Sequence, residues 1–67
     1  MFFELNDGTV INKHWLNNVF IDENDDTKVV YEMVNGSKHY EQFDTAQEAS
    51  NRKDEVVTML TDTVLWD

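Results

Sequence analysis

The sequence predicts an α+β protein: a four- to five-stranded, mostly antiparallel meander sheet with one C-terminal helix packed on one face. Three observations support this prediction. Apolar residues alternate along the first two thirds of the chain, Asp-Gly and Asn-Gly pairs interrupt the alternation, and helical spacing replaces it after residue 44. With 67 residues and no repeat or linker, we expect a single domain over residues 1–67.

The first two strands are expected to form a hairpin. Side chains alternate over residues 1–5, and a second strand begins at Thr9. Between them, Asp7-Gly8 favours a type I′ turn, because both central positions of that turn need positive φ. Residues 12–18 then fit neither the two-residue period of a strand nor the 3.6-residue period of a helix, which predicts a short helical turn or a bulged corner.

An acidic turn follows the predicted third strand over residues 19–21. Residues 22–26 are all polar and carry four carboxylates, whose like charges keep such a turn solvated. The segment opens like a calcium-binding EF-hand loop, but Thr27 replaces the required glycine and Met33 the final glutamate. We therefore expect a solvated turn, which could also dock a basic partner.

The clearest predicted element is a hairpin of residues 29–34 and 37–43 around Asn35-Gly36. A two-residue Asn-Gly connection between apolar runs is typical of a type I′ turn. A bulged turn would shift the strand register by one residue, and the sequence leaves that alternative open.

In the type I′ register, Glu32 opposes His39 and Tyr31 opposes Tyr40. Because directly opposed residues share a face of the sheet, Tyr40 is then expected to join the face that meets the core. The predicted members of that face are Val29, Tyr31, Met33 and Tyr40.

Two overlapping capping boxes predict the start of the helix, Asp44 with Gln47 or Thr45 with Glu48. After it, one helical face carries mainly apolar residues: Ala46, Ala49, Lys53, Val56, Val57, Leu60 and Val64. The other face is polar: Glu48, Asn51, Asp54, Glu55, Thr58 and Asp62. The apolar end, residues 64–66, is expected to extend the helix or fold back onto the sheet.

Composition limits the classes of partner. Fourteen Asp and Glu against five Lys and Arg give a formal net charge of −9, which repels nucleic acid and anionic lipid and favours cationic partners. The chain has no cysteine, no apolar run of membrane-spanning length and no signal-peptide pattern, so we expect a cytoplasmic protein. Direct nucleic-acid binding and membrane insertion are not expected.

The residues that could carry chemistry are few. His14 and His39 have no cysteine and no serine–histidine–acid spacing around them, so no nucleophilic triad is predicted. Carboxylate pairs such as Glu41 with Asp44 are expected to be surface charges. We predict no catalytic residue, no cofactor and no metal ligand, and therefore no enzyme.

A single helix covers only one face of a sheet, and the aromatic residues are more numerous than that face needs. Phe2, Phe20, Val30, Val34 and Phe43 are expected to line the opposite face, unless edge loops and Trp66 cover them. An uncovered face would mark a partner or homodimer interface. The candidate partner-binding residues are Asp22, Glu23, Asp25, Asp26, Phe20, Val30, Phe43 and Trp66.

Several motifs follow one another along the chain: Leu5-Asn6-Asp7-Gly8, Ile11-Asn12, the apolar Leu16 and Val19, Asp26-Thr27 and Asn35-Gly36. Their order over roughly residues 5–60 is similar to that of small bacterial FlbD/SwrD-like flagellar-operon proteins. Residues 43–49 depart from that pattern and look more like the helix start of short proteins carried by bacterial phages and prophages. Both kinds are small and non-enzymatic, and the resemblance transfers no site residue.

These observations predict a small acidic accessory or regulatory module, plausibly phage- or prophage-encoded, that binds a protein with a basic or apolar docking surface. The alternative is a DNA mimic that inhibits a nucleic-acid-binding protein, because rows of carboxylates can imitate a phosphate backbone. The carboxylates considered for that role are Asp22, Glu23, Asp25, Asp26, Glu48, Asp54, Glu55 and Asp62.

Overall fold

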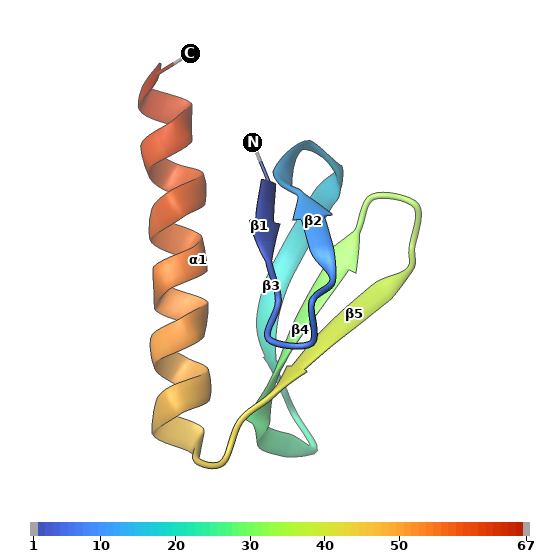
Figure 1. The fold of residues 1–67 in the computed structure, drawn as a ribbon, viewed down its shortest axis with the longest axis vertical. Helices are drawn as coiled ribbons and strands as arrows, with labels where there is room; N and C mark the ends of the chain where they lie inside the picture. Colours follow the sequence, from blue (N-terminus) through green and yellow to red (C-terminus); the bar gives the residue numbers. More distant parts are fainter. Residues whose placement is uncertain (1, 67) are drawn as a thin grey trace.

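A computed structural model describes the backbone of residues 2–66 and the side chains of residues 2–60. It is an α+β fold with five strands and one C-terminal helix, as predicted (Figure 1). The elements are β1 (Phe2–Glu4), β2 (Val10–Asn12), the 3-10 helix η1 (Lys13–Trp15), β3 (Leu16–Asp22), β4 (Asp25–Met33), β5 (Lys38–Gln42) and α1 (Ala46–Trp66).

The strands form two antiparallel sheets, so the prediction of one continuous meander is wrong. One sheet pairs β1 with β2, and the other has the order β3-β4-β5. The division falls at η1, where the Asn12 side chain accepts a hydrogen bond from the His14 N–H at 3.0 Å and turns the chain. The predicted helical turn in this segment is confirmed, and a bulge between Leu16 and Asn18 follows it.

Both hairpins close with the same loop geometry. In the first, the Leu5 N–H donates to the Thr9 carbonyl at 2.7 Å and the Gly8 N–H donates to the Leu5 carbonyl at 3.0 Å. The equivalent bonds of the second join Met33 to Ser37 at 2.8 Å and Gly36 to Met33 at 2.9 Å.

These hydrogen bonds define three-residue loops that end on a glycine at positive φ, 94° at Gly8 and 92° at Gly36. No described non-glycine residue has positive φ. The predicted type I′ turns are therefore wrong, since each would need two residues in that region.

The three-residue loop sets the β4–β5 register one residue away from the predicted one. Tyr31 opposes His39 and Val30 opposes Tyr40, so the predicted Tyr31–Tyr40 and Glu32–His39 pairs do not form. The observed register is the bulged alternative. A one-residue shift turns every side chain of β5 to the other face of the sheet.

The inner face of the β3-β4-β5 sheet carries Val19, Val29 and Tyr31 and packs against α1 and the β1–β2 hairpin. Val29 and Tyr31 are 0% exposed, as are Ala49 and Val56 of α1. The cluster is completed by two residues of the hairpin segment, Leu5 and Ile11. The prediction that Val29, Tyr31 and Met33 face the core is confirmed, whereas Tyr40 lies on the outer face.

The helix is capped at its start by Thr45 and Glu48, one of the two predicted capping pairs. The Thr45 hydroxyl oxygen accepts the Glu48 N–H at 3.1 Å and donates to the Glu48 carboxylate at 3.2 Å. Ala46 and Val57 are exposed, so the predicted apolar stripe is narrower than expected. Residues 64–66 extend the helix, and the predicted positions of the Val64 and Asp62 side chains lie outside the described residues.

Gly36 offers a test of the loop. A Cβ at this position would meet no heavy atom within 4 Å, so Gly36→Ala isolates the cost of positive φ for a residue with a side chain. We expect Gly36→Ala to lower the free energy of unfolding by about 1–2 kcal/mol. Gly36→Asn should cost less, because asparagine tolerates this region. Urea denaturation measures both, and no loss from alanine would contradict the loop geometry.

Candidate functional site

The outer face of the β3-β4-β5 sheet carries a row of three large apolar side chains. Phe20 opposes Val30 across β3 and β4, and Val30 opposes Tyr40 across β4 and β5. Directly opposed residues stand side by side on the same face of a sheet. Val30 is buried but lies outside the main core cluster, and Tyr40 is 48% exposed. The row is thus a separate apolar surface on the side of the sheet away from α1.

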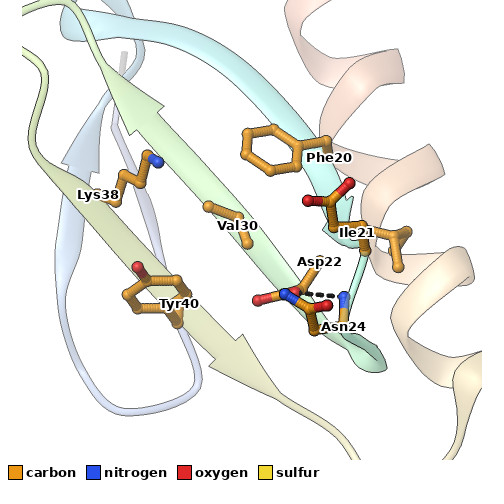
Figure 2. Close-up of a pocket in the computed structure, with 8 residues that line it drawn as sticks. Phe20, Ile21, Asp22, Asn24, Val30, Lys38 and Tyr40 are labelled. Carbon is orange, nitrogen blue, oxygen red and sulfur yellow. Dashed lines mark hydrogen bonds between the residues drawn. The ribbon is translucent and has the colours of Figure 1, made fainter.

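A hollow of about 310 Å³ opens over this row (Figure 2). Val30 lies at its floor with only 2% of its surface exposed, and Phe20 and Tyr40 stand on either side. The rest of its lining is polar apart from Ile21: Asp22, Glu23, Asn24 and Lys38.

The two ends of the hollow differ in charge. Asp22 and Glu23 lie at the β3–β4 turn, where Asp22 Oδ1 accepts the Asn24 N–H at 2.8 Å and fixes the turn. Lys38 lies at the other end, with its ammonium directed toward the hollow (Figure 2). Lys28 does not line the hollow, but its Nζ lies 5.3 Å from the centroid of the Tyr40 ring.

The structure brings four of the predicted site residues together around the hollow: Phe20, Val30, Asp22 and Glu23. Asp25 and Asp26 follow the same turn but do not line it. Hydrogen bonds from the side chain and backbone of Thr27 lower the pKa of Asp25 and hold its carboxylate at the start of β4.

Other predicted members of the outer surface lie elsewhere. Phe43 follows β5 and packs against the main core, so its predicted place on the outer face is wrong. Phe2 in β1 and Val34 in the β4–β5 loop are exposed but do not line the hollow. Trp66 is in the last turn of α1, and the position of its side chain lies outside the described residues.

The inner face contains an ionic centre that the sequence analysis missed. Glu41 is only 1% exposed, so the prediction that it is a surface charge is wrong. Its Oε1 accepts hydrogen bonds from the Tyr31 hydroxyl and from Arg52 Nε, the latter at 2.8 Å, and its Oε2 accepts the Asn6 backbone N–H at 2.8 Å. Charged groups are buried only when they are paired and hydrogen-bonded in this way.

Arg52 joins this centre to the first hairpin. Its guanidinium also donates to the Glu4 carbonyl at 2.8 Å and to the exposed Glu55 carboxylate. Burial disfavours the charged form of Arg52, but the hydrogen bond and the charge of Glu41 outweigh it and raise the pKa of Arg52. The guanidinium is therefore a permanent cation at this position.

A second hollow of about 320 Å³ lies beside the ionic centre, lined by Glu4, Leu5, Asn6, Glu41, Phe43 and Arg52. Among the residues whose side chains are described, no buried side-chain nitrogen or oxygen lacks a hydrogen-bond partner. The buried polar atoms of this hollow are thus occupied by one another, and we assign it a structural role.

One sequence signal could have revealed the centre. Arg52 lies three residues after Ala49 and four before Val56, so it belongs to the buried stripe of α1 at helical spacing. A cation in that stripe requires a buried anion, and Glu41 is the buried charged residue among those described.

Neither histidine lines the outer hollow. His14 is exposed in η1, and His39 opposes Tyr31 in the sheet. Within the described residues, no group of three or more His, Asp or Glu side chains is arranged to hold a metal ion.

Searches against protein-family models, curated proteins and solved structures find no match to this chain. The likenesses noted from the sequence therefore stay predictions. A functional assignment has to be argued from the geometry of the outer face.

The ionic centre allows a matched test, because Glu41 and Glu55 both contact Arg52 but only Glu41 is buried. We expect Glu41→Gln to lower the free energy of unfolding by about 3 kcal/mol, since it leaves the part-buried Arg52 without its buried anion. Glu55→Gln should cost less than about 1 kcal/mol. Urea denaturation of both variants measures the difference, and equal losses would contradict the assigned role of Glu41.

Tyr31 gives a prediction for alkaline pH. Burial, with the hydrogen bond and charge of Glu41, raises the pKa of Tyr31 above its ordinary value of 10.0. The unfolded chain therefore loses this proton first, so the stability linked to Tyr31 is complete below about pH 10 and is lost above it. Between about pH 8 and about pH 11, we expect the free energy of unfolding to fall less in Tyr31→Phe than in the unmodified protein, as measured by urea denaturation. An equal fall in both proteins would contradict this linkage.

Proposed function

We propose that this protein is a small non-enzymatic module that binds another protein through the outer face of its β3-β4-β5 sheet. The observation that carries the proposal is the hollow over Val30, flanked by Phe20 and the half-exposed Tyr40 on the side away from α1. Aromatic side chains beside a concave apolar surface are typical of the centre of protein interfaces.

The polar groups also favour binding over catalysis. A catalytic carboxylate needs a free oxygen near the substrate, whereas both oxygens of the buried Glu41 accept hydrogen bonds within the fold. The outer hollow combines an apolar floor with a lining that is half polar, which suits recognition of a segment that carries both an apolar and a charged side chain.

An accessory or regulatory role in the cytoplasm fits these properties. The chain has no cysteine, in keeping with a reducing compartment. No helix among the described residues has the length and apolar character needed to cross a bilayer. A formal charge of −9 steers the protein toward cationic partners.

The proposal predicts that Tyr40→Ser reduces capture of a partner from a native lysate by at least about tenfold, because the ring at the centre of the surface is lost. Val10→Ser is the matched control: Val10 is 60% exposed, more than Tyr40, but lies in β2 outside the hollow. Quantitative affinity capture with each immobilised variant checks the prediction. Capture that Tyr40→Ser leaves unchanged, or that Val10→Ser reduces equally, would rule out the outer face.

Two further measurements separate the alternatives. The mass in solution distinguishes a complex with another protein from a homodimer on the same face. Salt dependence distinguishes the outer face from a DNA mimic, because binding through rows of carboxylates weakens steeply with added salt, whereas binding anchored by the rings of Phe20 and Tyr40 weakens less.

A further inference from the structure

We infer that the occupant of the outer hollow is an extended segment of a partner protein that inserts one apolar side chain over Val30 and places a cationic side chain at the β3–β4 turn. This inference rests on the proposed function and adds the chemistry of the partner. It follows from the size of the hollow, its apolar floor and the unequal charge of its two ends.

The size and lining of the hollow fit a single anchoring side chain. Its volume of about 310 Å³ is at the lower end of the range of binding pockets. The floor is Val30 and the sides are Phe20 and Tyr40, so an apolar group is complementary to this part of the lining. An aromatic or branched side chain satisfies both conditions, whereas a whole helix cannot enter.

The β3–β4 turn selects a cation beside that anchor. Glu23 makes no hydrogen bond or ion pair in the described part of the chain, and Asp22 adds a second carboxylate at the same end. Carboxylates at the mouth of an apolar hollow are complementary to lysine or arginine. Lys38 occupies the other end, so the cation is expected on only one side of the anchor.

Exposed aromatic residues on a sheet can also stack nucleic-acid bases. Here Asp22 and Glu23 lie at the rim and the chain carries a net charge of −9, both of which repel phosphate. The charges therefore favour a protein segment, and an oligonucleotide serves as the competing probe.

The test is an NMR titration of the ¹⁵N-labelled full chain with three capped peptides: Ser-Lys-Gly-Trp-Gly-Ser, the same peptide with Glu for Lys, and the same with Ala for Trp. We expect the lysine–tryptophan peptide to shift the amides of Phe20, Val30 and Tyr40. The glutamate peptide should bind roughly two- to fivefold more weakly, as for an exposed ion pair. The peptide without tryptophan should bind at least about tenfold more weakly.

Two charge-reversal variants locate the cation. Glu23→Lys and Asp54→Lys change the net charge equally, but Asp54 is exposed on α1 and does not line the hollow. We expect Glu23→Lys to remove or reverse the preference for the lysine peptide and Asp54→Lys to retain it. Equal effects of the two variants would show that only net charge matters and would overturn the inference.

Other outcomes also overturn it. The protein could bind the glutamate peptide or oligothymidylate more tightly than the lysine–tryptophan peptide. The peptides could shift only amide signals outside the outer hollow, or no peptide could bind at all. If capture in the lysate still depends on Tyr40 while the charge preference is absent, the partner class is wrong and the proposed function stands. If capture does not depend on Tyr40, the proposed function fails as well.

Discussion

The carboxylate of Glu41 is the interaction on which the rest of the structure depends. It accepts hydrogen bonds from β4 through Tyr31, from α1 through Arg52 and from the first hairpin through the Asn6 N–H. One side chain of β5 therefore fixes α1, the β3-β4-β5 sheet and the β1–β2 hairpin relative to one another. Apolar contacts are non-directional, whereas this centre requires particular donors in particular places.

The same carboxylate explains why the two faces of the β3-β4-β5 sheet differ. With Glu41 on the inner face, its neighbours Tyr40 and Gln42 in β5 lie on the outer face. The large apolar ring of Tyr40 is thus excluded from the core and joins Phe20 and Val30. The pairing that completes the core therefore also creates the apolar row over which the hollow opens.

The sequence predicts the local features of this fold better than the long-range ones. The Thr45–Glu48 capping box and the apolar alternation of β4 are local, and the structure confirms both. The sequence also predicts that Phe20 and Val30 lie on the outer face, because alternation alone determines which side chains of β3 and β4 share a face.

The position of β5 could not be obtained in that way. Asn35-Gly36 permits either a two-residue or a three-residue loop, and hydrophobicity favours Tyr40 over Glu41 for the core. In the structure the three-residue loop places Glu41 on the inner face, where it is paired with Arg52 of α1. The helical spacing of Arg52 indicates a buried anion but does not identify it as Glu41, so the sequence does not predict that Lys38 and Tyr40 of β5 line the hollow.

The β4–β5 register depends on the number of residues in the exposed loop at residues 34–36. Its residues are all exposed, and exposed loop tips are normally where proteins tolerate insertions and deletions. Here the removal of one residue would turn β5 over, bringing Tyr40 toward the core and carrying Glu41 to solvent. The exposed Val34 side chain can be replaced without loss of a core contact, whereas Gly36 is needed for its positive φ and a change of one residue in the length of the loop is not compatible with the fold. Among homologues, this loop is therefore expected to keep its length and its glycine.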